Sequence, residues 1–316
     1  MRRPVAALVL AAFATGCSGG HSPTVVTGAD ATGTTGTSTT TAPIPTTGPA
    51  SSSSTTTRAA ASTTTRPAAT TAPAGVTTLA EGDPATVAAA LATSEAAIRD
   101  PATPPADLEG QGRAQQVAYR QLAAHPEWLA EVVGRVPPAL QATVRANAGA
   151  GAELRALTAP RPALPPWRIV APAPADELLG YYKAAQARIG VPWTYLAAIH
   201  LVETRMGRIR GTSTSGAQGP MQFLPATWGQ YGAGGDINSN GDAILAAARL
   251  LAHNGAPADM ANALFAYNRS QHYVNAVTAY AGQMAGNERA YFGYYQWQVY
   301  YRLADGDRLL PVGYGS

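Results

Sequence analysis

The sequence predicts an all-α protein in which two helical segments follow a long N-terminal region of low complexity. From residue 84 onward, apolar residues recur at helical spacing, and Pro or Gly separates the runs. No run shows the apolar–polar alternation of a half-buried strand. Between positions 22 and 78 the chain is rich in Thr, Ser, Ala and Pro and has no aromatic residue. The 316 residues suffice for two domains, and this composition leaves the first quarter outside them.

The N-terminus has the layout of a signal peptide for export. Arg2 and Arg3 precede an apolar run, Val5–Ala14, which is shorter than the roughly 20 residues that a membrane span requires. Small residues then lead to Cys17, the only cysteine of the chain. This end resembles a bacterial lipobox, although Ala14 stands where Leu is more usual. We expect lipidation of Cys17 after cleavage; the alternative is a plain signal peptide with an incidental cysteine.

Residues 18–80 predict a disordered tether between this anchor and the folded part. Between Ser22 and Thr78 the charged residues are Asp30, Arg58 and Arg66. Such a composition cannot bury enough apolar surface to offset the entropy lost on ordering. With a lipid anchor, this arrangement places the protein in the cell envelope, outside the cytoplasm and attached to the membrane.

Two helical segments follow the tether, separated by a Pro-rich stretch at 159–174 that we expect to be an extended linker. The first segment, 81–158, has no site-like cluster, so its role stays open. We expect its helices at 84–99, 112–124, 126–135 and 138–147. The second segment, 175–316, predicts a separate domain with helices at 175–189, 192–206, 220–230, 242–253, 257–268, 271–284 and 288–303.

One acidic residue lies on an apolar helix face. In the predicted helix 192–206, the side chains Tyr195, Leu196, Ile199, Val202 and Met206 share a face, and Glu203 lies within it. Apolar surroundings disfavour the carboxylate anion and should raise the pKa of Glu203. A carboxyl group with a raised pKa suits a general acid near neutral pH. The alternative is an ion pair of Glu203 with Arg205, Arg208 or Arg210.

Two further stretches carry residues suited to a ligand site. The run 216–225 (GAQGPMQFLP) begins with Gly and has amide and apolar side chains at its centre. Such a loop lets the backbone approach a ligand, and its amides can form hydrogen bonds with sugars. Farther on, Ala266-Tyr267-Asn268 ends a predicted helix with an aromatic residue and an amide, which could orient a carboxyl group.

Together these motifs resemble the lytic transglycosylases, whose SLT domain is related in fold to goose-type lysozyme. That family shows Glu-Ser, Gly-Leu-Met-Gln and Ala-Tyr-Asn in this order, and this chain has Glu203-Thr204, Gly219-Pro220-Met221-Gln222 and Ala266-Tyr267-Asn268. The run 235–244 is similar to the membrane-bound murein transglycosylase B branch. The resemblance covers about residues 178–285 and implies a lysozyme-like catalytic domain.

The resemblance also implies an activity and a set of site residues. The activity is cleavage of the β-1,4 bond between N-acetylmuramic acid and N-acetylglucosamine in peptidoglycan glycan strands, leaving 1,6-anhydro ends. Glu203 is then the general acid and later the base, and Tyr267 positions it. The substrate-binding residues implied in this way are Thr204, Gln218, Met221, Gln222, Phe223, Tyr267 and Asn268.

A second carboxylate and a metal site are both poorly supported. A two-carboxylate hydrolase needs a partner acid about 5–9.5 Å from the first. The candidates by motif are Asp236 and Asp242, and Asp242 also suits the start of the helix 242–253. The run 236–241 copies half of a calcium loop, but Ala247 stands where such a loop requires Glu. We expect no metal and no other cofactor, with calcium at 236–241 left open.

Alternatives in other classes remain. A lysozyme-type hydrolase would use water in place of the substrate's own hydroxyl, and a non-catalytic lipoprotein would only bind the wall. The formal charge of +3 includes no basic stripe in a folded segment, so we expect no nucleic-acid partner. The expected partners are glycan strands and, through the lipid, the membrane, and we expect a monomer.

Overall fold

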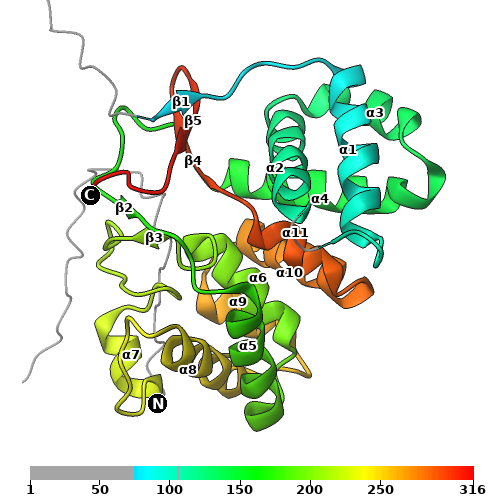
Figure 1. The fold of residues 1–316 in the computed structure, drawn as a ribbon. Helices are drawn as coiled ribbons and strands as arrows, with labels where there is room; N and C mark the ends of the chain where they lie inside the picture. Colours follow the sequence, from blue (N-terminus) through cyan, green and yellow to red (C-terminus); the bar gives the residue numbers. More distant parts are fainter. Residues whose placement is uncertain (1–74, 105–106) are drawn as a thin grey trace, which may run out of the picture. The chain divides into compact units, whose positions relative to one another are not determined.

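Helices account for most of the regular structure in the computed structural model, which describes residues 75–104 and 107–316 (Figure 1). The all-α prediction is confirmed, with eleven α-helices in these residues. The predicted signal peptide, the lipidation site Cys17 and all but the last few residues of the predicted tether lie outside them. No helix in the described part of the chain is long and apolar enough to cross a bilayer.

The first helical segment contains the helices predicted there, although α2 begins four residues earlier and α4 ends nine residues later than predicted. It comprises α1 (Pro84–Arg99), α2 (Leu108–Ala124), a 3-10 turn (Pro126–Trp128), α3 (Leu129–Arg135) and α4 (Pro138–Ala156). Asp83 caps α1 because its carboxylate accepts hydrogen bonds from the backbone N–H groups of Ala85 and Thr86, at 2.9 and 3.0 Å. Proline at the first position begins both α1 and α4, where its missing N–H costs nothing.

The second segment contains α5 (Ala175–Ile189), α6 (Trp193–Thr204), α7 (Pro225–Tyr231), α8 (Asn240–His253), α9 (Met260–Tyr267), α10 (Gln271–Gly286) and α11 (Arg289–Tyr295). Gly190 ends α5 in the left-handed conformation that glycine adopts without a steric cost. The helix predicted at 220–230 begins only at Pro225, because residues 218–223 form a tight loop instead.

The helix predicted over 288–303 is wrong at its C-terminal half. The chain forms β4 (Val299–Leu303) and β5 (Gly306–Leu310), an antiparallel hairpin with a two-residue turn, and β1 (Thr77–Thr78) pairs with β5. The alternating burial of Val299 and Tyr301 and the Asp305-Gly306 turn signal favour a hairpin over a helix. A second antiparallel pair joins β2 (Arg168–Ile169) to β3 (Ile209–Arg210), so the Pro-rich stretch 159–174 contributes a strand and the buried Trp167.

The two helical segments share one hydrophobic core. All described residues fall in a single compact unit, and the largest buried cluster includes side chains of α1, α2 and α4 together with those of α5, α6 and α8–α11. In Figure 1, α10 and α11 lie against α1, α2 and α4. A Cβ at Gly293 of α11 would lie only 2.9 Å from the Ile98 side chain of α1, so these helices pack in direct contact.

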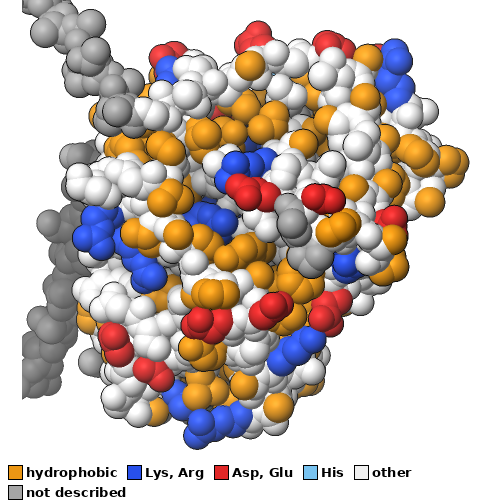
Figure 2. Space-filling model, in the orientation of Figure 1, with side chains coloured by type: hydrophobic (Ala, Val, Ile, Leu, Met, Phe, Trp, Pro, Cys, Tyr) orange, Lys and Arg blue, Asp and Glu red, His pale blue; other side chains and the backbone are white. Residues whose placement is uncertain are grey.

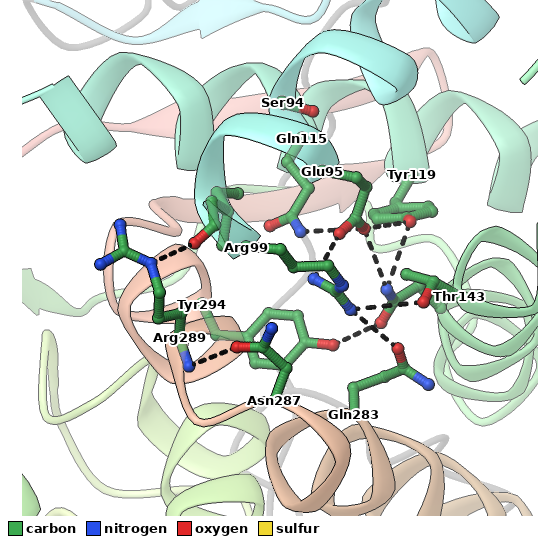
Figure 3. Close-up of polar contacts among 12 residues, drawn as sticks. Ser94, Glu95, Arg99, Gln115, Tyr119, Thr143, Gln283, Asn287, Arg289 and Tyr294 are labelled. Carbon is green, nitrogen blue, oxygen red and sulfur yellow. Dashed lines mark hydrogen bonds and ion pairs between the residues drawn. The ribbon is translucent and has the colours of Figure 1, made fainter. Parts of the chain in front are cut away.

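A buried polar network reinforces this shared core (Figure 3). The Glu95 carboxylate of α1 is fully buried, and its Oε1 accepts hydrogen bonds from Gln115 at 3.0 Å, from Asn147 at 3.2 Å and from the Tyr119 hydroxyl. Its Oε2 pairs with Arg99 at 2.7 Å. Every oxygen of this carboxylate therefore has a donor, as a buried anion requires.

The network continues into the C-terminal helices and to Trp297, between α11 and β4. Three hydrogen bonds make this connection: Arg99 to Gln283 at 3.0 Å, Tyr294 to Asn147 at 2.5 Å, and Trp297 to Gln115 at 2.9 Å. They hold α1, α2 and α4 in a defined position against the second segment. The polar surface shows no comparable organisation: in Figure 2 acidic and basic side chains are interspersed, with basic side chains near β2 and β3.

Candidate active site

Glu203 lies in the last turn of α6 and is only 3% exposed, which confirms the expected burial of this acid. The Tyr273 hydroxyl of α10 donates a hydrogen bond to its Oε1 at 2.9 Å. Its other oxygen, Oε2, is buried without a hydrogen-bond partner. Within residues 75–104 and 107–316 Glu203 makes no ion pair, so the alternative of a pair with Arg205, Arg208 or Arg210 is wrong.

Burial raises the pKa of Glu203 from 4.5 to about 8, and the hydrogen bond from Tyr273 opposes this rise. The carboxyl group is therefore predominantly neutral at pH 7. Because Oε1 accepts a hydrogen bond from Tyr273, the acidic proton resides on Oε2, where it can be donated to a substrate. A neutral acid with one unpaired O–H is the form that general acid catalysis requires.

The hydroxyl that holds Glu203 belongs to Tyr273 and not to the predicted Tyr267. Tyr267 donates its hydrogen bond to the backbone carbonyl of Met221, at 2.6 Å. The two rings stack in parallel with centroids 6.3 Å apart, so Tyr267 supports both Tyr273 and the loop. Tyr273 was not predicted as a site residue because it lies on the buried face of α10, where a tyrosine usually serves only to fill the core.

The loop 218–223 is fixed by its own backbone. Gln218 and Phe223 exchange two N–H···O=C hydrogen bonds of 2.9 Å. Gly219 has a φ of +74°, and a Cβ there would lie 1.9 Å from the Ile237 carbonyl oxygen, so only glycine fits. The Thr204 hydroxyl donates to the Pro220 carbonyl at 2.6 Å and accepts from the Gly207 N–H at 3.1 Å, which ties α6 to the loop. Thr204 therefore performs a structural task that any hydroxyl side chain of this size could perform.

Most of the residues predicted to bind substrate lie beneath the surface. Six of them are at most 3% exposed: Thr204, Met221, Gln222, Phe223, Tyr267 and Asn268. Gln218 is the exception, since it is partly exposed and lines a pocket together with Ile209, Arg210 and Asn238. Contacts connect several of them to Glu203: Thr204 is its neighbour in α6 and binds the loop at Pro220, and Tyr267 binds the loop at Met221 and stacks on Tyr273. Gln218 lies at the surface, in a pocket that does not include Glu203.

Glu203 lines a second pocket whose opposite walls come from outside the motif region. Val202, Glu203 and Arg205 form one side. The others are formed by residues of α2, α4, α10 and the β4–β5 hairpin: Gln116, Tyr119, Arg120, Leu154, Arg155, Tyr280, Val299, Tyr300, Tyr301, Arg302 and Asp307. Ile209 lines both pockets, so they adjoin at β3. None of these wall residues was predicted, because they are far from the motifs in sequence.

The two acids considered as partners of Glu203 serve their own loop. The Asp242 carboxylate accepts from the Asp236 N–H at 3.0 Å, and Asp236 accepts from the Asn238 N–H at 2.9 Å. Neither lines the pocket that contains Glu203, whereas Asp307 does, paired with Arg120 at 2.5 Å. In the part of the chain that the structure describes, no group of three or more His, Cys, Asp or Glu side chains could hold a metal ion.

The comparisons with known proteins identify one family in this region. No curated protein and no solved structure matches the chain. Residues 180–289 match the family model of the transglycosylase SLT domain, a range that extends from α5 to the first residue of α11 and includes both Glu203 and Tyr273. The chain therefore carries a lytic transglycosylase-type domain.

Proposed function

We propose that the protein cleaves peptidoglycan glycan strands as a lytic transglycosylase, with Glu203 as the catalytic acid and base. The observation that carries this proposal is the neutral, buried Glu203 carboxyl group, held through Oε1 by Tyr273 and unpaired at Oε2. Glu203 lines a pocket, and it lies in the region that matches the transglycosylase SLT domain. The substrate bond is the β-1,4 link from N-acetylmuramic acid to N-acetylglucosamine.

In the first step, the proton on Glu203 Oε2 passes to the glycosidic oxygen as its bond to C1 of the muramic residue breaks. The acetamido oxygen of the same residue supplies the electron pair to C1, so the enzyme needs no carboxylate nucleophile. Glu203 is now an anion, and it accepts the proton of the 6-hydroxyl while that oxygen attacks C1. A 1,6-anhydro ring forms, the acetamido group is released, and Glu203 is again neutral.

This sequence of steps suits the site because Glu203 lies against the pocket without a cation paired to it, and the other acid of the described lining, Asp307, is paired with Arg120. The Tyr273 hydroxyl donates to Oε1 in both states, so it holds the side chain in place and stabilises the transient anion. Digestion of purified peptidoglycan tests the proposal directly. Products with 1,6-anhydro ends, one water lighter than those of a hydrolase, are expected.

Reducing ends would instead show that water attacks C1. Asp307 would then be the acid to test as a base, since it shares the pocket with Glu203. Its carboxylate already pairs with Arg120 at 2.5 Å and lies 3.6 Å from Arg155, which favours a role in the pocket wall. An intact chain that binds glycan without cleaving it would support the non-catalytic alternative.

We further propose that Cys17 is lipidated and holds the enzyme at the outer face of the membrane. The support is the sequence pattern, an apolar run followed by small residues and the only cysteine. Cys17→Ala should release the protein from the membrane fraction into the soluble fraction of the cell envelope. If Cys17→Ala remains membrane-bound, the lipid anchor is not the means of attachment.

A further inference from the structure

The pocket beside Glu203 is rich in cations. Four guanidinium groups line it: three lie on other elements (Arg120, Arg155 and Arg302) and one, Arg205, lies next to Glu203 at the end of α6. The acids in the same lining are Glu203, which is neutral at pH 7, and Asp307. One carboxylate therefore faces four cations in a largely apolar and aromatic pocket, where unbalanced charge is costly.

The single carboxylate does not satisfy these groups. Arg120 Nη2 pairs with Asp307 Oδ2 at 2.5 Å, but Arg120 Nε is buried without a hydrogen-bond partner. Arg155 Nη1 lies 3.6 Å from Asp307 Oδ1, which is beyond hydrogen-bond distance. Arg302 uses Nη1 to donate to the backbone carbonyls of Arg155 and Thr158, at the end of α4.

The mutual repulsion of these arginines has a visible effect. Burial lowers the pKa of Arg302, and the charges of Arg155 and Arg120 also lower it while Asp307 raises it. Burial also lowers the pKa of Arg205, to about 10. An anion entering the pocket would therefore offset the repulsion among these guanidinium groups.

We propose that the arginine-lined wall of this pocket, formed by Arg120, Arg155 and Arg302, binds a carboxylate of the substrate next to the sugar on which Glu203 acts. The inference rests on the proposed function and deepens it. A guanidinium recognises a carboxylate through paired, charge-assisted hydrogen bonds, for which Arg155 and Arg120 have unused N–H groups. In a murein strand the carboxylates belong to the muramic residue: to its lactyl group when the strand is bare, or to the peptide stem attached there.

The helical segment 81–158 acquires a role on this basis. Arg120 lies on α2 and Arg155 on α4, and the Glu95 network fixes both helices against the second segment. Arg120 also packs over the Tyr300 ring of the hairpin, at 4.7 Å, so both flanks of the family-matching region contribute to the same wall. The flanks thus select substrates that carry a carboxylate, while α6 supplies the acid.

Binding to three oligosaccharides of equal length tests this inference independently of turnover. The probes are a tetramer of N-acetylglucosamine, which has no carboxylate, a bare murein tetrasaccharide with lactyl carboxylates, and the same tetrasaccharide with peptide stems. Full-length Glu203→Gln would be titrated with each by calorimetry at pH 7, so that none is cleaved. We expect the carboxylate-bearing probes to bind about 10- to 100-fold more tightly, the range for charge-assisted hydrogen bonds.

The two murein probes distinguish the source of the carboxylate. Tight binding of the bare strand points to the lactyl group, and tight binding only with stems points to the peptide. In either case Arg155→Gln should remove the preference, whereas Arg145→Gln, an exposed arginine of the same helix outside the pocket, should retain it.

Equal affinity for all three probes, or a preference that survives Arg155→Gln and Arg120→Gln, would overturn the inference. Comparison of the probes in the same protein needs no arginine variant, so misfolding of a variant cannot obscure this outcome. If the native chain cleaves no peptidoglycan but the preference for carboxylates depends on Arg155, the proposed function fails and the binding site stands.

Discussion

Two buried glutamates of this protein, Glu95 and Glu203, have opposite surroundings. Glu95 receives hydrogen bonds from Gln115, Tyr119 and Asn147 and an ion pair from Arg99. Glu203 receives one hydrogen bond, from Tyr273, and its second oxygen has no partner. The donors to Glu95 offset the cost of burying it and connect three helices, whereas the burial of Glu203 is not offset in this way and raises its pKa to about 8.

The largest expected effect concerns the underpartnered acid. Glu203→Gln should reduce turnover on peptidoglycan by roughly 10²–10⁴-fold, the usual contribution of general acid–base catalysis. The variant should stay folded, because Gln has the same shape and can still accept from the Tyr273 hydroxyl. Release of soluble muropeptides from purified peptidoglycan measures this. Turnover close to that of the wild type would exclude Glu203 as the acid.

The same substitution should change how stability depends on pH. Glu203 has a pKa of about 8 in the folded chain and an unperturbed value of 4.5. Between these values the folded chain binds more protons than the unfolded chain, so this group makes stability fall as pH rises. Glu203→Gln removes that loss. The free energy of unfolding of the variant, relative to that of the wild type, should therefore rise by roughly 4 kcal/mol between pH 5 and pH 8. Urea unfolding at both pH values measures it, and a constant difference would contradict the raised pKa.

Glu95→Gln should act on stability and leave the chemistry intact. It breaks a buried ion pair with Arg99, so unfolding should become easier by about 3 kcal/mol. That corresponds to a Tm lower by roughly 6–12 °C. Turnover per folded molecule should be unchanged below that temperature. The exposed pair Glu109–Arg113 offers a control, since Glu109→Gln should cost less than about 1 kcal/mol.

The smallest expected effect distinguishes the two stacked tyrosines. Tyr273→Phe removes the hydrogen bond that lowers the pKa of Glu203, so that pKa should rise further. The loss of activity at high pH should then shift upward, and kcat/KM at pH 7 should fall by about tenfold. Tyr267→Phe, which loses its bond to the Met221 carbonyl, should leave this pH limit in place. The pH profiles of kcat/KM for both variants provide the measurement. Equal shifts in the two would assign the positioning to the pair as a whole.

Local signals in the sequence were sufficient for much of the fold and for the burial of Glu203. Asp83 and the prolines give the helix starts, and the apolar face around Glu203 gives its burial. Tyr273 could not be identified in this way, because a tyrosine on a buried face looks like ordinary core. The hairpin was not predicted because no Pro or Gly separates the end of α11 from β4, so the aromatic run fits a continuing helix. The Asp305-Gly306 turn signal comes only after that run.

Long-range contacts account for the rest. The pocket wall joins Arg120 to Asp307, which are 187 residues apart in the sequence, and no periodicity or motif connects them. The same holds for the Tyr294–Asn147 and Trp297–Gln115 bonds. The Pro-rich stretch therefore predicts a boundary between 81–158 and 175–316, but no local signal indicates the core that the two segments share.

The Glu95 network has a practical consequence for anyone who transplants or truncates this enzyme. The family match covers 180–289, yet a fragment cut at those limits would lose α1, α2 and α4 and leave the apolar side of α10 without its cover. Gln283 would also lose its bond to Arg99. Such a fragment should aggregate, since a large exposed apolar surface promotes association. We expect the piece that can be moved between proteins as a unit to extend instead from β1 to β5, because the region that matches the family model is shorter than the part of the chain that shares one core.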